Sequence, residues 1–162
     1  MSSLDGFAVE LSSRIARAGG YCTVDQAKGI WGSPSPFWTS VPNDTILHWI
    51  ESNQGPVCHA IGTNNVAGWQ QYWEPLINVD LFDWIFDSSS MGLRKPDPEF
   101  WSYIEGRTGV RGDTMLLVDD RLSNVEAAIN HGWHGIHFQD SRECVRLVED
   151  WSRESAEGTM GS

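Results

Sequence analysis

The chain has 162 residues, a length that favours one domain large enough to bury a hydrophobic core. Its formal net charge is −11, which argues against nucleic acid or an anionic membrane surface as a partner, because both require basic patches. No apolar run approaches the length of a membrane span, the N-terminal residues lack a signal-peptide core, and the cysteines are few and far apart. We therefore expect a soluble, cytoplasmic protein with reduced thiols.

The first part of the chain is predicted to be helical. Apolar residues recur at helical spacing over residues 4–18, and the Gly19-Gly20 pair supplies a stop. A short helix is predicted from Thr23 to about Gly29, and a further helix over residues 44–52, after a proline-containing loop over 31–42. These features predict a short helical N-terminal segment over residues 1–53.

From residue 54 onward, predicted strands alternate with predicted helices. The strands are expected at residues 57–61, 85–86, 114–118 and 134–138. This alternation favours an α/β fold with a parallel sheet and right-handed crossovers. The last helix is expected over residues 142–151, so the α/β core is predicted to span 54–152, with a disordered tail over 153–162.

A lysine precedes one of the predicted helices. Lys95 stands two residues before Asp97, which is expected to be the N-cap, and Pro98 suits the first helical position. A lysine that the adjacent residues fix at the start of a helix offers a counter-charge for a bound anion.

An acidic pair follows the apolar run at residues 114–118. Asp119 and Asp120 end this predicted strand, and a Ser-x-x-Glu capping box over 123–126 is expected to open the next helix. Ligands bind at the carboxyl ends of strands in parallel α/β sheets, so the two carboxylates indicate a site for a hard cation. A lysine, a metal and a strand end together suggest a phosphate ligand.

Three segments resemble motifs of the haloacid dehalogenase (HAD) superfamily. Residues 92–101 (GLRKPDPEFW) and 116–128 (LLVDDRLSNVEAA) resemble its third and fourth motifs, and residues 61–65 (IGTNN) resemble its second, in the same order. The resemblance covers roughly residues 42–140. It implies the three-layer α/β/α, Rossmann-like fold of the phosphatase-type branch.

The resemblance also implies an activity, that of a Mg²⁺-dependent phosphohydrolase acting on a small-molecule phosphate. In that chemistry Thr63 would donate its hydroxyl to a phosphoryl oxygen, with Asn64 beside it. Lys95 would bind the same oxygens and offset the charge of the nucleophile. Asp119 and Asp120 would hold the Mg²⁺, which neutralises charge when one anion attacks another.

These residues also have structural interpretations. Thr63 and Asn64 stand where any strand-to-helix loop favours capping residues, and Lys95 could be a surface residue. Two adjacent acids at a strand end are harder to explain without a cation, because like charges repel. The histidines and most tryptophans are interpreted as structural, although Trp38 is a candidate for lining an apolar substrate pocket.

The first motif of the superfamily, Asp-x-Asp-Gly-Thr, carries the nucleophilic aspartate and is not found in its usual place. Residues 3–7 (SLDGF) could be a degenerate copy, with Asp5 at the acid/base position. Alternatively, these residues simply belong to the helix over 4–18. The short helices up to residue 53 would then be a remnant of the helical cap that many members insert after this motif.

The fold is therefore predicted to lack the usual first strand, which is central in the superfamily. Its loss would leave backbone groups that must be paired again. We predict that residues 57–61 pair directly with 114–118, giving one four-stranded sheet. The alternative is that a homodimer partner, another chain or a preceding segment supplies the strand.

Two classes of function remain open, so whether the protein is an enzyme is undecided at this level. One is a HAD-like phosphohydrolase, eroded or completed by a partner. The other is a HAD-derived module that no longer hydrolyses phosphate. It would be a pseudoenzyme that binds a ligand, or a repurposed small-molecule catalyst such as a cyclase or isomerase.

Overall fold

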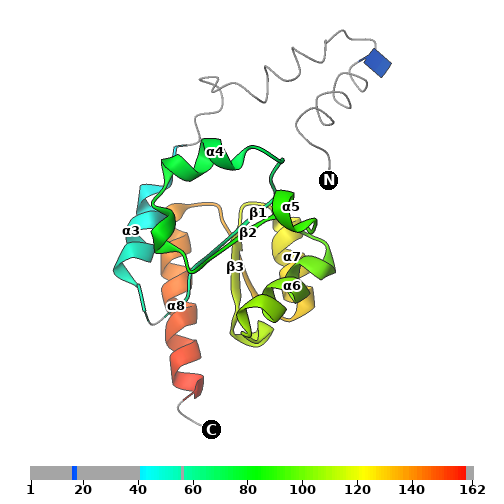
Figure 1. Ribbon diagram of the computed structural model, residues 1–162. Helices are drawn as coiled ribbons and strands as arrows, with labels where there is room; N and C mark the ends of the chain where they lie inside the picture. The colour runs from blue at the N-terminus through cyan, green and yellow to red at the C-terminus, as the bar shows by residue number, and fades with distance from the viewer. Residues whose placement is uncertain (1–15, 18–40, 56, 160–162) are drawn as a thin grey trace. The chain divides into compact units, whose positions relative to one another are not determined.

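The structure is a computed structural model that describes residues 16–17, 41–55 and 57–159 (Figure 1). The chain forms two compact units, one containing His59–Gly92 and the other containing Asn43–Cys58 together with Leu93–Ser162. Each unit is described by itself. Residues 16 and 17 are helical, as predicted, and the rest of the expected N-terminal helix lies outside the described residues.

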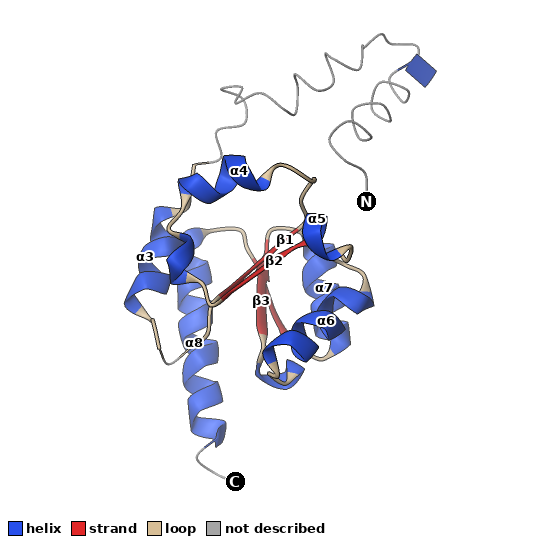
Figure 2. Cartoon of the chain, viewed as in Figure 1, coloured by secondary structure: helices blue, strands red, loops and turns tan. Residues whose placement is uncertain are grey.

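The first unit is built on two parallel strands, β1 (Ala60–Thr63) and β2 (Trp84–Asp87), shown in red in Figure 2. The connection between them carries α4 (Gln70–Trp73) and the short 3₁₀ helices η2 (Glu74–Leu76) and η3 (Val79–Leu81). After β2, the chain continues into α5 (Ser88–Met91). This helical crossover between parallel strands confirms the predicted β-α-β arrangement.

Strand β1 starts three residues later than the sequence pattern predicts. The pairing of the two strands begins at His59, whose backbone N–H donates to Asp83 Oδ2 at 2.8 Å and whose carbonyl accepts from the Asp83 N–H at 2.8 Å. The register then pairs Thr63 with Asp87, so both strands end at the same level. The shift places Thr63 on the last position of β1 instead of in the loop beyond it.

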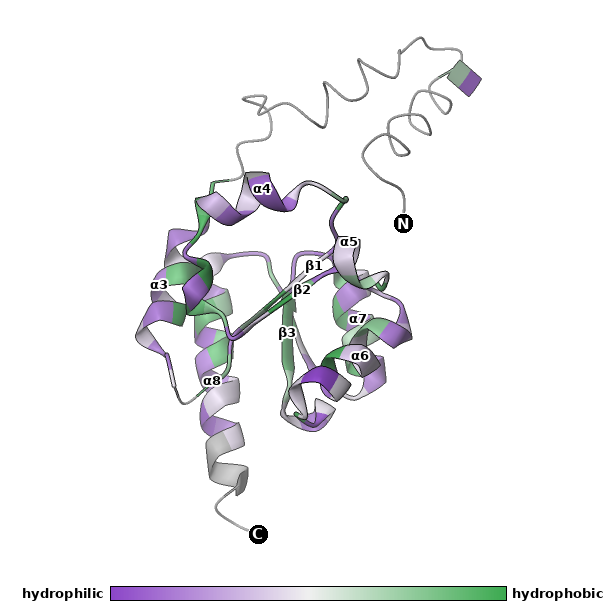
Figure 3. Cartoon of the chain, in the orientation of Figure 1, coloured by the Kyte–Doolittle hydropathy of each residue, from purple (hydrophilic) through white to green (hydrophobic). Residues whose placement is uncertain are grey.

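The second unit contains the parallel strands β3 (Leu116–Asp119) and β4 (His134–His137), connected through helix α7 (Leu122–His131). Helix α6 (Pro98–Thr108) and the 3₁₀ turn η4 (Gly112–Thr114) lead into β3. Three consecutive apolar residues make β3 the apolar strand visible in Figure 3. Such runs are typical of strands in parallel sheets.

The core of this unit lies between α6 and α7. Trp101 and Phe100 on α6 are fully buried, and the Trp101 ring meets the rings of Phe100 and Trp133 edge to face, at centroid distances of 5.1 and 5.2 Å. Val125 and Ala128 on α7 complete this buried set. Edge-to-face aromatic pairs add to the stabilisation that burial alone provides.

Gly135 in β4 allows α7 to lie close against the strand. A Cβ atom at this position would come within 2.8 Å of Val125 Cγ1 and 3.0 Å of Ile129 Cγ1. Any larger residue would therefore push the helix and the strand apart. The glycine is a packing requirement of the β3-α7-β4 unit.

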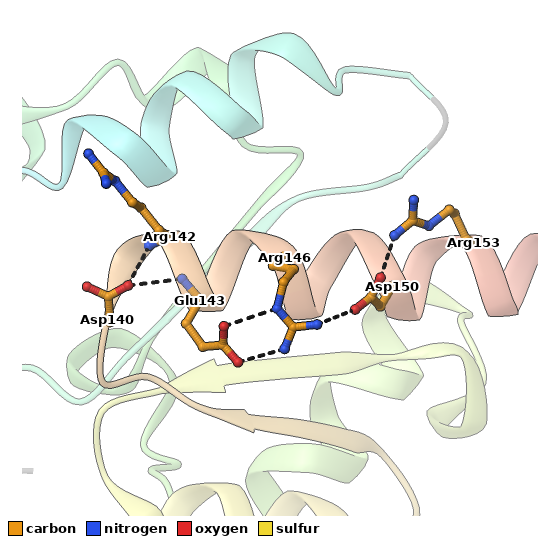
Figure 4. A network of polar contacts seen from close by, with 6 residues as sticks. All are labelled: Asp140, Arg142, Glu143, Arg146, Asp150 and Arg153. Carbon is orange, nitrogen blue, oxygen red and sulfur yellow. Dashed lines mark hydrogen bonds and ion pairs between the residues drawn. The ribbon is translucent and has the colours of Figure 1, made fainter.

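The remaining helices of the second unit are α3 (Asp44–Ser52), which matches its predicted bounds, and α8 (Ser141–Thr159). Asn43 caps α3 by accepting from the Ile46 N–H, and its side-chain amide donates to Ser141 Oγ at 2.8 Å. Asp140 caps α8 by accepting from the N–H groups of the next turn (Figure 4). Each helix therefore has a side-chain cap, and the bond between Asn43 and Ser141 links the starts of the two helices.

Helix α8 is longer than predicted, because the sequence pattern ended it at residue 151. Arg146 bonds to Glu143 at 2.7 Å and to Asp150 at 2.8 Å, and Arg153 bonds to Asp150 (Figure 4). Ion pairs at these helical spacings stabilise a helix without apolar contacts. Residues 153–159, expected in a disordered tail, instead continue the helix.

The predicted α/β class with parallel strands is confirmed, and the predicted sheet is not. Within the described residues, the strands form two two-stranded sheets, β1 with β2 and β3 with β4. The direct pairing predicted between residues 57–61 and 114–118 is absent from these pairings. The prediction of this pairing rests on the need to pair backbone groups again, and that need does not specify which strand becomes the partner. The domain boundaries at residues 53 and 152 stay predictions.

No helix within the described residues combines the length and the apolar character needed to cross a membrane. The cytoplasmic location stays a prediction.

Candidate functional site

The centre of the candidate site is a buried ion pair in the second unit. Lys95 Nζ lies 2.5 Å from Asp119 Oδ2, and these residues are only 8% and 7% exposed. Lys95 comes from the segment before α6, and Asp119 is the last residue of β3. The predicted anion-binding lysine and the first predicted metal-binding carboxylate are thus brought together at one strand end.

Lys95 and two further donors bind the two oxygens of Asp119. Oδ2 faces Lys95, whereas Oδ1 accepts from the Arg121 backbone N–H at 2.8 Å and from Asn124 Nδ2 at 3.0 Å. Asn124 is itself 3% exposed. The carboxylate is therefore held in one orientation from both sides.

Burial on its own would raise the pKa of the Asp119 carboxyl, because it disfavours the charged form. The hydrogen bond and positive charge of Lys95, the Arg121 N–H and the Asn124 amide outweigh that effect, so the pKa lies below its ordinary value. Asp119 is accordingly an anion at neutral pH.

The predicted capping box at residues 123–126 is wrong. Helix α7 begins at Leu122, its N-cap is Arg121, and no side chain caps it there. Asp119 takes the Arg121 N–H instead, so the strand-end carboxylate ties the start of α7 to β3. The predicted start of α6 is confirmed, because Asp97 is its N-cap and Pro98 its first residue. The Asp97 side chain makes no capping bond.

Asp120 differs from Asp119 in its surroundings. It is exposed, and its backbone carbonyl contacts His137 Nε2 at 3.1 Å, across from the end of β4. The described residues contain no group of three or more His, Cys, Asp or Glu side chains that could hold a metal. Two carboxylates still fit Mg²⁺, because this ion takes oxygen ligands, uses one or two carboxylates and keeps several waters.

The second predicted motif lies in the first unit. Thr63 ends β1, Asn64 follows it, and both are half-buried. The next residue, Asn65, donates from Nδ2 to Asp87 Oδ2 at 2.9 Å and from its backbone N–H to Ser88 Oγ at 2.8 Å. The two predicted phosphate-binding residues are therefore neighbours of a tight polar cluster at the ends of β1 and β2.

Two predicted site residues, Asp5 and Trp38, lie outside the described residues. Conversely, sequence reasoning missed Asn124 and Asp87. Asn124 carries a usable signal, because the first turn of a helix that follows an acidic strand end faces that end. Asp87 gives no comparable signal, since a single acid before a run of serines is also an ordinary helix cap.

No protein-family model matches the chain. Among curated proteins, it is 32% identical over 87 residues to flavin mononucleotide hydrolase 1 of Arabidopsis thaliana, covering 53% of this chain and 36% of that protein. It is 44% identical over 69 residues to sesquiterpene phosphatase astK of Aspergillus oryzae, covering 42% and 35%. It is also 29% identical over 108 residues to drimenol cyclase drtB of Aspergillus calidoustus, covering 64% and 20%. The chain thus spans about a third of the length of the first two relatives.

Solved structures with the same fold include a predicted HAD-like family hydrolase of Porphyromonas gingivalis. The TM-score is 0.66 at 20% identity, covering 91% of this chain and 74% of that one. A HAD family enzyme of Bacteroides thetaiotaomicron, in complex with magnesium and inorganic phosphate, gives a TM-score of 0.60 at 18% identity, covering 82% and 67%.

The chain therefore has the fold of HAD-like hydrolases, and the predicted resemblance to this superfamily is confirmed. Its matched curated relatives include phosphatases and a cyclase.

Proposed function

We propose that this protein takes part in Mg²⁺-dependent hydrolysis of a small-molecule phosphate. The observation that carries the proposal is the buried contact between Lys95 and Asp119, with Asp120 next to it at the end of β3. A buried ion pair often contributes little net stability compared with apolar residues of the same volume. Its position at a strand end is better explained by a chemical role.

Each described residue has a task in this proposal. The ammonium group of Lys95 binds the non-bridging oxygens of the phosphoryl group and offsets their charge. Thr63 donates its hydroxyl to a phosphoryl oxygen, and Asn64 supports the same part of the substrate. Asp119 and Asp120 would hold Mg²⁺, which when bound neutralises phosphate charge. Asn124 keeps Asp119 oriented for that role.

The nucleophile and the acid/base are the parts of the reaction that these residues do not supply. In one arrangement, residues 3–7 are the degenerate first motif and Asp5 takes the acid/base position. In the other, a second copy of the chain, another chain or a preceding segment supplies the strand that carries the nucleophilic aspartate in the superfamily. A nucleophilic carboxylate attacks phosphorus and forms an acyl-phosphate that water then hydrolyses.

The relatives suggest two kinds of phosphate ester as substrates, flavin mononucleotide and a sesquiterpenyl phosphate. The second kind has an apolar tail, which agrees with the proposed role of Trp38 in an apolar pocket. Release of inorganic phosphate from each compound, compared with a generic aryl phosphate, separates these substrate classes.

The test of the proposal is phosphate release with and without Mg²⁺ in the wild type, Lys95→Ala and Asp119→Asn. Asp80→Asn is a matched control, because Asp80 is an exposed acid at η3, before the start of β2 and not at the carboxyl end of a strand. We expect Mg²⁺-dependent turnover in the wild type and the control, and its loss in the other two variants. Turnover that is independent of Mg²⁺, or that persists in both variants, would rule the proposal out.

The second candidate is a non-hydrolytic module or a repurposed catalyst such as a cyclase or isomerase. It is favoured by the match to drimenol cyclase, which covers a larger share of this chain than either phosphatase match. The nine tryptophans provide a fluorescence signal for binding of an apolar ligand. Binding of a sesquiterpenyl compound without any phosphate release would favour this candidate over the hydrolase.

A further inference from the structure

We propose that Asp87 and Ser88 are positioning residues that fix the conformation of the chain directly after Thr63, by clamping Asn65. The inference deepens the proposed function and rests on it to the extent that Thr63 and Asn64 bind a phosphoryl group. Neither Asp87 nor Ser88 is assigned to contact the substrate.

The clamp uses every polar group of Asn65. The backbone N–H donates to Ser88 Oγ at 2.8 Å, and the Ser88 hydroxyl donates to the Asn65 carbonyl at 3.3 Å. The side-chain Nδ2 donates to Asp87 Oδ2 at 2.9 Å, and Oδ1 accepts from the Val66 N–H at 2.9 Å. The residue two positions after Thr63 is therefore held by main chain and side chain together.

Asp87 is 3% exposed, so a carboxylate is buried at the end of β2. Its oxygens accept from Asn65 Nδ2 and, at 2.7 Å, from the Ser89 N–H. No cationic side chain within the described residues forms an ion pair with it. Burying a charge is costly unless hydrogen bonds compensate for it, and a neutral asparagine would cap the short helix α5 equally well. The feature that a carboxylate adds is its bond to Asn65.

The register of the two strands explains why the bond between Asn65 and Asp87 affects Thr63. Thr63 pairs with Asp87, so the chain leaves β1 at the level where the clamp acts. Groups that are held in place before the substrate arrives need no reorganisation during the reaction. A displacement of about 1 Å in such groups can cost about 10²-fold in rate. The clamp would thus control how well Thr63 and Asn64 receive the phosphoryl oxygens.

A swap of the two side chains tests the inference. Asn65→Asp places two carboxylates face to face, and Asp87→Asn places two amides there, so each single variant opposes like groups. The double variant carries the carboxylate at position 65 and the amide at position 87, and all of the bonds can form with donor and acceptor exchanged. Asp83→Ala is the control, because Asp83 links the same two strands at their other end, through the His59 N–H.

Two measurements are made on all variants of the full chain, kcat and KM for an aryl phosphate and hydrogen exchange of the amides of residues 63–66. We expect each single variant to lose about 10²-fold in kcat/KM and to exchange faster, and the double variant to recover most of both. We expect Asp83→Ala to lose stability while its kcat/KM stays close to that of the wild type. Single variants as active as the wild type, or a double variant no better than the singles, would overturn the inference.

Failure of the proposed function has a different signature. If the wild type releases no phosphate, that proposal falls, and the clamp is judged by hydrogen exchange alone. Fast exchange at Asn65 and Val66 in the single variants, with slow exchange restored in the double variant, supports the clamp in that case. Exchange unchanged by Asn65→Asp and Asp87→Asn contradicts it.

Discussion

Lys95 Nζ lies 2.5 Å from Asp119 Oδ2, and the two charged groups are buried together. Asp119 accepts from the Arg121 N–H and from Asn124 on one oxygen, and from the Lys95 ammonium on the other. The pair therefore has a fixed anion and a cation directed at it. The removal of either member should therefore disturb a buried charged group.

Breaking the pair should destabilise the protein more than replacing it. We expect Lys95→Met and Asp119→Leu to lower the free energy of unfolding by about 3–5 kcal/mol each, because each removes the opposite charge from beside a buried charged group. The double variant should lose less than the sum, since neither charge remains. Urea unfolding of the four proteins measures the coupling, and purely additive losses would show that the two groups do not interact.

The contribution of Asp119 should depend on pH in a defined direction. Its pKa is lowered in the folded protein, so the carboxylate form is stabilised by folding. The stabilisation is fully present above the unfolded pKa of about 4 and is lost as the pH falls through the lower, folded pKa. The difference in unfolding free energy between the wild type and Asp119→Asn should therefore shrink as the pH falls below about 4. A difference that stays constant down to about pH 2 would contradict this.

Asn124 should stabilise the protein through its hydrogen bond to Asp119. We expect Asn124→Ala to cost about 1–3 kcal/mol, because it removes a buried amide that donates to a carboxylate. Asn124→Asp should cost more at neutral pH, since it places a second carboxylate beside the first, and should recover part of the loss in acid. Thermal unfolding at two pH values measures both effects. Equal stability of the two variants at every pH would show that the amide does not act on Asp119.

Gly135 offers a test of the packing between α7 and β4. We expect Gly135→Ala to destabilise the protein by about 1–3 kcal/mol, because its Cβ would lie 2.8 Å from Val125 Cγ1. Gly106→Ala is the matched control, since Gly106 lies within α6 with nothing within 4 Å of an added Cβ. That change should stabilise by up to about 1 kcal/mol, owing to the higher helix propensity of alanine. Urea unfolding of both variants should give opposite signs, and the same sign would refute this description of the packing.

The sequence predicted the elements that depend on local patterns. The start of α6 at Pro98, the bounds of α3 and the strand ending at Asp119 all follow from capping residues and runs of apolar residues. The sequence also predicted that Lys95 and Asp119 serve one purpose. The structure adds that they are in direct contact.

Features that depend on residues far apart in the chain could not be predicted in the same way. The direct contact between Lys95 and Asp119 joins residues 24 positions apart, which only the fold brings together. Likewise, the contact between Asn65 and Asp87 joins residues 22 positions apart, across two strands whose register the sequence does not specify.

The central claim is that Lys95, Asp119 and Asp120 form part of a Mg²⁺-dependent phosphate site. Its most direct test is the Mg²⁺ dependence of phosphate release in the wild type, Asp120→Asn and Asp80→Asn. We predict that Asp120→Asn needs a markedly higher Mg²⁺ concentration for half-maximal activity, because one of the two proposed carboxylate ligands becomes neutral. The Asp80→Asn control should match the wild type. An unchanged Mg²⁺ requirement in Asp120→Asn, or no Mg²⁺-dependent release by the wild type, would contradict the claim.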